Sequence, residues 1–168
     1  MRAALALCVT VVAAACRYQP TPVPLLGAPA DIAAMAGEWS GEYFSAQSGR
    51  SGSISFSIVA GKDTAFGDVV MTPWRGQPLV AADVASRAHA LHSPAPDVLK
   101  VQFVRVRGGE MEGALEPYLA PDCQCAVTTV FQGVLRGNTI RGRYVTTGAV
   151  GLRQEGDWSV ARKLVATR

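Results

Sequence analysis

The chain has 168 residues, a formal net charge of +3 and charged side chains at 17% of its positions. Apolar residues make up 49% of the chain, which excludes wholesale disorder. The charge excess is too small and too scattered to indicate a nucleic-acid-binding protein. Two His and four Cys leave little material for metal or nucleophile chemistry.

The first residues predict export. Met1 and Arg2 form a short positive region, and an uncharged apolar run follows over residues 3–15. This run is too short for a transmembrane helix of about 20 residues and has the length of a signal-peptide core. We therefore expect residues 1–15 to be a signal peptide that is removed after Ala15.

The bond between Ala15 and Cys16 fits two kinds of cleavage. Small residues at positions 13 and 15 are typical of an ordinary signal-peptidase site. The same segment resembles a bacterial lipobox, in which Cys16 becomes the first mature residue and carries lipid. On that interpretation the protein is a membrane-anchored lipoprotein of the bacterial cell envelope, with its domain in the periplasm or at the cell surface.

Residues 16–30 are rich in proline, which favours an extended, semi-rigid chain and disfavours an interior strand. We expect this segment to be a tether, and residues 31–168 to form the folded domain. Asp31–Gly37 is predicted to form one helical turn, with Asp31 as its N-cap and Gly37 as its end.

Eight strand-like runs follow the helical turn. They are Trp39–Ala46, Ser53–Ala60, Phe66–Thr72, Val98–Arg107, Glu110–Tyr118, Ala126–Leu135, Thr139–Thr146 and Gly156–Arg162. Two-residue turns such as Gly108-Gly109 and Gly137-Asn138 join sequence neighbours, which indicates antiparallel pairing.

In six of these runs a glycine falls on the same face as the large apolar residues. These glycines are Gly41, Gly67, Gly113, Gly133, Gly142 and Gly156. Glycine is unfavourable inside a strand, but a small closed barrel needs residues without a Cβ where its strands coil tightly. The sequence therefore predicts an all-β fold, an eight-stranded antiparallel up-and-down barrel with an N-terminal helical turn.

The fourth run changes its apolar face, which predicts a β-bulge near Phe103-Val104. One long insertion, residues 75–97, separates the third and fourth strands. Within it, residues 80–91 have apolar side chains at helical spacing, and either a helix across one barrel mouth or an extra strand fits.

Gly37-Glu38-Trp39 at the start of the first strand and Arg162 near the end of the last one resemble the calycin superfamily, the lipocalin- and avidin-like barrels. First and last strands are neighbours in a closed barrel, so the resemblance implies a cation–π pair between Trp39 and Arg162. The chain lacks the distant paired disulfides of secreted lipocalins. Both histidines lie in the insertion, which argues against a haem barrel.

Cys123 and Cys125 are the two thiols left once Cys8 is removed and Cys16 is lipidated. In an exported domain such a pair most often forms a disulfide. It could serve as a loop clip, carry out redox or metal chemistry, or remain as idle thiols. His89 and His92 could complete a zinc-like set with these cysteines, but nothing in the sequence brings the two segments together, so we expect no metal.

The chain shows no catalytic motif and no phosphate-binding loop, so we expect neither an enzyme nor a cofactor. The leading hypothesis is a barrel that binds a small apolar or aromatic ligand. The residues expected to line its pocket are Trp39, Tyr43, Phe103, Phe131, Tyr144 and Trp158. A filled barrel that acts as an envelope interaction module is the first alternative, and a redox or metal role of Cys123 and Cys125 is the second.

Overall fold

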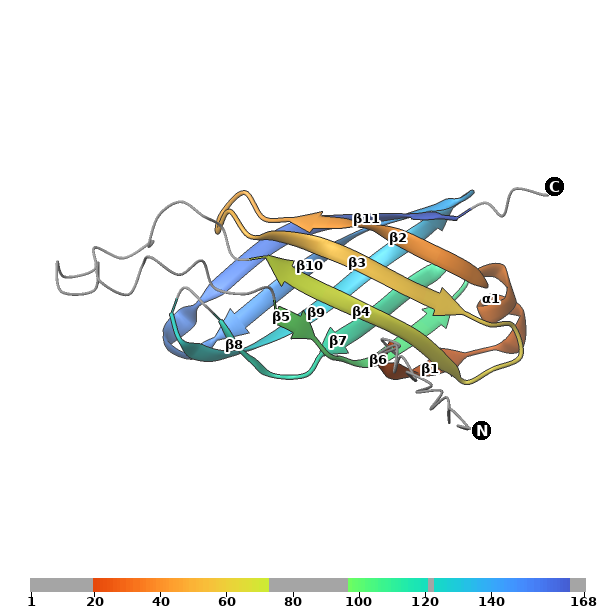
Figure 1. Ribbon diagram of the computed structural model, residues 1–168, viewed down its shortest axis with the longest axis horizontal. Helices are drawn as coiled ribbons and strands as arrows, with labels where there is room; N and C mark the ends of the chain where they lie inside the picture. Colours follow the sequence, from red (N-terminus) through yellow and green to blue (C-terminus); the bar gives the residue numbers. More distant parts are fainter. Residues whose placement is uncertain (1–19, 73–96, 121–122, 164–168) are drawn as a thin grey trace, which may run out of the picture.

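The computed structural model describes residues 20–72, 97–120 and 123–163, which form a closed β-barrel with one short helix (Figure 1). The expectations for the signal peptide, for Cys16, for residues 80–91 and for the two histidines lie outside these residues. The elements in chain order are β1 (Pro22–Gly27), α1 (Pro29–Ala34), β2 (Gly37–Phe44), β3 (Ser51–Ile58), β4 (Thr64–Thr72), β5 (Asp97–Leu99), β6 (Val101–Arg107), β7 (Glu110–Leu115), β8 (Tyr118–Ala120), β9 (Cys125–Arg136), β10 (Thr139–Gly148), the 3₁₀ turn η2 (Ala149–Gly151) and β11 (Arg153–Arg162).

The barrel wall has the strand order β1-β6-β7-β9-β10-β11-β2-β3-β4, and β4 pairs with β1 to close it. The pairs are antiparallel except for β1 with β6, which is parallel. Two short strands are additional, β5 on β4 and β8 on β9. The expected all-β antiparallel barrel is thus confirmed, but its strand number is corrected from eight to nine.

The eight predicted strands are all present, with boundaries that differ by a few residues. The fourth is interrupted at Lys100 and appears as β5 and β6. The fifth appears as β7 and β8, because Pro117 cannot donate a backbone hydrogen bond to a ladder. The ninth wall strand is β1, which lies in the segment that the sequence predicted to be a tether.

Proline did not prevent β1 from entering the wall, contrary to the sequence expectation. The prolines Pro22 and Pro24 are exposed, whereas Val23 and Leu25 between and after them are buried. The segment therefore has the alternating pattern of a strand with one face in the core.

The hydrogen bonds of β1 explain why the two prolines are tolerated. The ladder to β4 uses the neighbouring residues: Gly67 donates its N–H to the Thr21 carbonyl at 3.1 Å, and Leu25 donates to the Asp63 carbonyl at 2.7 Å. Polar backbone groups of successive strand residues point to opposite sides, so the proline nitrogens face away from β4. The pairing with β6 begins only at Leu25, beyond both prolines.

Strand β1 is inserted between β4 and β6 at one end of the barrel only. β4 pairs with β1 at Thr64–Phe66 and with β5 at Val69–Met71. With β5 and β6 counted as one bent strand, the wall has eight strands at the end near β5. It has nine at the end where α1 lies (Figure 1).

Helix α1 lies at the nine-stranded end and buries Ile32 and Met35. It begins at Pro29, so the predicted cap at Asp31 is wrong. Proline at the first helical position has its φ angle already set and lacks only an N–H that would have no partner there. Ala28 precedes the helix without a side-chain cap.

Trp39 and Arg162 meet beside α1. The Arg162 guanidinium carbon lies 4.7 Å from the centroid of the Trp39 ring. The indole N–H donates to the Met35 carbonyl at 3.0 Å, and Arg162 donates to the Ala34 carbonyl at 2.8 Å. These contacts tie the end of the helix to the first and last strands of the meander.

The bulge in the fourth predicted strand lies between Val101 and Phe103, where the register of β6 against β7 shifts. Val101 lies on the inner side before the shift, and the buried Val104 and Val106 lie on it afterwards. The extra residue turns Phe103 to the outer face, where the Arg105 guanidinium carbon lies 5.8 Å from the centroid of its ring. No helix in the described ranges is long and apolar enough to cross a membrane.

Candidate functional site: an apolar cavity inside the barrel

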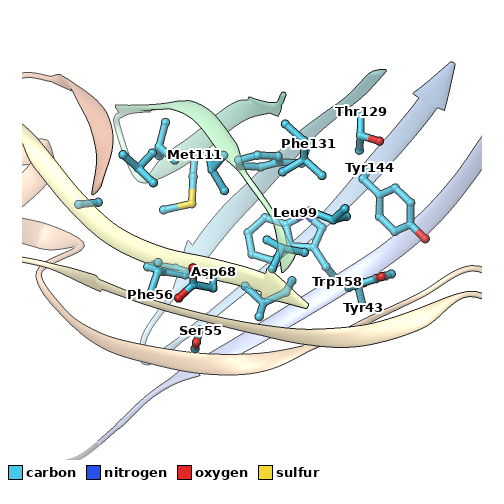
Figure 2. A pocket seen from close by; sticks show the side chains of 18 of the residues that line it. Tyr43, Ser55, Phe56, Asp68, Leu99, Met111, Thr129, Phe131, Tyr144 and Trp158 are labelled. Carbon is cyan, nitrogen blue, oxygen red and sulfur yellow. The ribbon is translucent and has the colours of Figure 1, made fainter. Parts of the chain in front are cut away.

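The interior of the barrel contains a cavity of about 100 Å³ (Figure 2). Most of its lining is aliphatic or aromatic. The lining residues are Val23, Tyr43, Ile54, Ser55, Phe56, Ile58, Ala65, Gly67, Asp68, Val69, Leu99, Val101, Val104, Met111, Leu115, Tyr118, Thr129, Phe131, Tyr144 and Trp158. They come from every strand of the wall, so the closed barrel itself builds the site.

The volume limits what the cavity can hold. Sites for drug-sized ligands measure about 300–1,000 Å³. An apolar cavity of about 150 Å³ in another protein stays dry and binds benzene. A volume of about 100 Å³ therefore suits a single ring or a short aliphatic chain, and it excludes a whole lipid molecule.

Four of the six aromatic residues expected to bind a ligand line this cavity. They are Tyr43, Phe131, Tyr144 and Trp158. The Tyr43 and Tyr144 rings meet edge to face with their centroids 5.7 Å apart, and Phe131 and Trp158 do so at 6.1 Å. Edge-to-face pairs are a favoured aromatic geometry and hold each ring in one orientation.

The other two expected residues, Trp39 and Phe103, do not border the cavity. Trp39 is buried beside α1 and stacks on Phe56 with the centroids 6.1 Å apart. Phe103 lies on the outer face because of the bulge described above. A single-residue shift in register moves a side chain to the other face of a strand, and the sequence pattern did not locate the shift closely enough.

Trp158 is positioned by two glycines on neighbouring strands. A Cβ at Gly133 would lie 2.5 Å from the indole ring, and a Cβ at Gly142 would also collide with it. The close approach brings the indole N–H within reach of two backbone carbonyls, those of Gln132 at 3.1 Å and Arg143 at 3.3 Å. The inward glycines of this barrel thus make room for aromatic rings.

The tyrosine and threonine hydroxyl groups of the lining gather at the end of the cavity away from α1. Thr129 contacts the Tyr118 hydroxyl at 3.0 Å and the Thr146 hydroxyl at 2.7 Å. Figure 2 shows Thr129, Tyr144 and Tyr43 on one side of the cavity, and Phe56 and Asp68 on the other. Burial raises the pKa of both Tyr43 and Tyr144, so both phenols keep their protons to a higher pH than an exposed tyrosine does.

The sequence did not single out several lining residues, among them Met111, Leu115, Tyr118 and Thr129. Met111 and Leu115 carry the alternating pattern of β7 and could have been found from it. Thr129 could not, because a threonine on an inward position does not stand out in composition or in apolar spacing.

Cys123 and Cys125 form a disulfide, with their Cα atoms 5.1 Å apart. Cys125 is the first residue of β9 and pairs with Ala120, the last residue of β8. The bond therefore lies where the chain enters β9, next to the last residue of β8, and neither cysteine lines the cavity. Gln124 between them has a positive φ of 50°, which is uncommon for a residue with a side chain.

Among the described residues, no group of three His, Cys, Asp or Glu side chains is placed to hold a metal ion. Asp68, the acidic residue of the described lining, is buried and accepts a hydrogen bond from the Thr21 hydroxyl at 3.3 Å. These contacts fasten the chain before β1 to the wall.

The chain matches no protein-family model, no curated protein and no solved structure. The closed β-barrel is compatible with a calycin-like fold.

Proposed function

We propose that this protein is a binding protein whose barrel holds a small apolar or aromatic molecule. The observation that carries the proposal is the cavity of about 100 Å³ inside the wall, with its aliphatic and aromatic lining. A barrel of this size has an interior wide enough either to be filled by side chains or to hold one small ligand. Space left between well-packed strands favours the second case, because an empty cavity forfeits packing contacts.

The calycin resemblance supports the same function. In the described structure Gly37 and Trp39 stand at the start of β2, next to Arg162 on β11, as the resemblance implies. Lipocalin- and avidin-like barrels hold small molecules in their interior, so the likeness at the α1 end of the barrel agrees with a ligand in the cavity. We propose membership of this superfamily on these grounds.

We further propose that the barrel is exported and held at a membrane of the bacterial cell envelope by a lipid on Cys16. The support for this location is the short positive region, the apolar run over residues 3–15 and the lipobox-like segment before Cys16. The ligand would then be bound outside the cytoplasm.

Toluene is a suitable first probe, because a single ring matches the cavity volume. We expect it to shift the NMR signal of the Trp158 indole N–H in a saturable way. The Trp39 indole N–H should not shift, because Trp39 does not line the cavity and its N–H donates to the Met35 carbonyl beside α1.

A matched pair of substitutions tests whether toluene binds inside the cavity. Val69→Phe adds a ring on the cavity side of β4, whereas Val130→Phe makes the same exchange on the exposed outer face of β9. Val69→Phe should abolish toluene binding and Val130→Phe should leave it unchanged. No saturable shift in the wild-type protein, or equal binding by both variants, would disprove the proposed function.

A further inference from the structure

The wall around β1 carries apolar side chains on its outer surface. Leu26 on β1 and Phe66 on β4 are 46% and 42% exposed, and Pro22 and Pro24 on β1 are exposed as well. Phe103 on β6, which the bulge turns outward, is partly exposed. We call these five residues the β1 patch.

The β1 patch is continuous across three neighbouring strands. Pro22 on β1 pairs with Phe66 on β4, and Leu26 on β1 pairs with Arg105 on β6. Phe103 lies two residues before Arg105, whose guanidinium carbon is 5.8 Å from the centroid of the Phe103 ring. A contiguous exposed apolar surface of this kind marks a contact site for another protein or for a membrane.

The opposite side of the wall is charged on its outer surface. Around the closed wall, β10 is four strands from β1 in one direction and β11 is four strands from it in the other, and Figure 1 shows β1 and β11 on opposite sides of the barrel. Outward side chains there form ion pairs, Arg143 with Asp157 at 3.6 Å and Arg153 with Glu155 at 2.8 Å. The β1 side is therefore the more apolar of the two.

The proposed lipid anchor lies on this apolar side. The chain is fastened to the wall at Thr21, whose carbonyl accepts a hydrogen bond from the Gly67 N–H at 3.1 Å. The Thr21 hydroxyl also donates to the Asp68 carboxylate at 3.3 Å. Cys16 is five residues before Thr21. Five residues of chain span at most about 18 Å, so a lipid on Cys16 holds the β1 side close to the membrane surface.

The structure makes this connection much shorter than the sequence indicated. A proline-rich tether over residues 16–30 would hold the barrel away from the membrane and leave it free to turn. Because β1 and α1 belong to the folded barrel, only residues 17–20 lie between Cys16 and Thr21, the first described residue that is hydrogen-bonded to the wall. A connection of this length favours one side of the barrel.

We propose that the β1 patch lies against the lipid bilayer to which Cys16 is anchored. Its apolar side chains leave water for the interfacial region, and the charged end of Arg105 stays among the polar headgroups. The short connection makes this contact intramolecular, so a small patch suffices to orient the barrel. This inference rests on the proposed location, because it needs the lipid on Cys16.

NMR of the lipid-bearing protein in bilayer discs of phosphatidylcholine and phosphatidylglycerol tests the orientation. Part of the phosphatidylcholine carries a nitroxide on its headgroup, which broadens the signals of nearby amides. The amide signals of Leu26, Phe66 and Phe103 should broaden, whereas those of Arg143 and Asp157 should not. Reduction of the nitroxide with ascorbate should restore the broadened signals.

Substitutions on the patch test whether its apolar side chains cause the orientation. In the double variant Leu26→Glu with Phe66→Glu, the difference in broadening between the two sides should be lost, because carboxylates stay in water. Phe44→Glu is the matched control, since Phe44 is 54% exposed on β2, outside the patch, and it should leave the difference unchanged. All three positions are exposed, and circular dichroism checks that both variants fold.

The two proposals fail in different ways. If mass spectrometry of the mature protein shows no lipid on Cys16, the proposed location is wrong, and this inference fails with it. If the lipid is present but both sides broaden equally, or if the double variant keeps the wild-type difference, the anchor stands and the docking of the β1 patch is overturned.

Discussion

The inward glycines decide how closely the strands and rings of this barrel can approach. Gly142 lies under the Trp158 indole and next to the Gln132 carbonyl, and neither neighbour leaves room for a Cβ. Trp158 in turn is fixed by its hydrogen bonds to the carbonyls of Gln132 and Arg143. A side chain at Gly142 would therefore have to move backbone rather than a flexible side-chain end.

Gly142→Ala should lower the free energy of unfolding by about 2–4 kcal/mol, in the range of overpacking and backbone strain combined. The matched control is Gly109→Ala in the β6–β7 turn. Gly109 has a φ of 81° and no atom within 4 Å of a Cβ, so only the backbone strain of about 1–2 kcal/mol applies there.

Urea denaturation of both variants measures the difference. A smaller loss at Gly142 than at Gly109 would show that Trp158 does not pack on the glycine as described.

The sequence predicted the inward positions of single residues well, except in β6, where Phe103 was placed on the wrong face. The parity of the six inward glycines could be predicted, because strict alternation places every second residue on one face. Tyr43, Phe131, Tyr144 and Trp158 share that parity and line the cavity. Phe103 does not, because the bulge in β6 reverses the parity between Val101 and Phe103, slightly earlier than the change of apolar face in the sequence indicated.

Among the elements, β1 is the one that the sequence assigned to the wrong part of the molecule. Proline density normally indicates a segment outside a sheet, since proline cannot donate to a ladder. Here both prolines fall on positions whose nitrogens face away from β4. That outcome depends on register, which local composition does not specify.

Adjacent substitutions in β1 distinguish a wall strand from a tether. Val23→Asp would bury an unpaired carboxylate in the core, where 2% of Val23 is exposed, and should destabilise the protein by about 3 kcal/mol or more. Pro24→Asp changes an exposed position and should cost about 1 kcal/mol or less.

Thermal unfolding followed by circular dichroism compares the two variants. Equal and small effects would show that residues 22–27 are not part of the folded wall.

The number of strands in the barrel wall differs between its two ends, with nine at the end where α1 lies and eight at the end near β5. The sequence correctly predicted the closed antiparallel meander, because short glycine turns indicate hairpins and the inward glycines indicate a tightly coiled, closed wall. The ninth strand could not be predicted, because its pairing with β4 and β6 joins segments far apart in the chain. The cavity depends on how side chains from all these strands pack together, and only the three-dimensional structure shows it.

The buried tyrosines make the stability of the whole barrel sensitive to alkaline pH. Burial raises the pKa of Tyr43 above its ordinary value of about 10, so the folded state keeps the proton after the unfolded state has lost it. The resulting contribution to stability is fully present below about pH 10 and is lost as the pH rises further.

Tyr43→Phe should therefore reduce the fall in unfolding free energy between about pH 9 and about pH 11. Denaturant unfolding of wild-type and variant protein across this range provides the measurement. Tyr144→Phe should act in the same direction, because burial raises that pKa too. An unchanged pH profile in both variants would contradict the burial of these phenols.

The insertion of β1 between β4 and β6 limits the order in which the strands of the barrel can pair during folding. β1, the first of the described strands, pairs with β4 and with β6, so it has no partner until both of these later segments are present. Until then the apolar side chains of Val23 and Leu25 remain without their place in the wall. The gap in the wall between β4 and β6 is therefore closed late in folding, by the strand that comes first in the described chain.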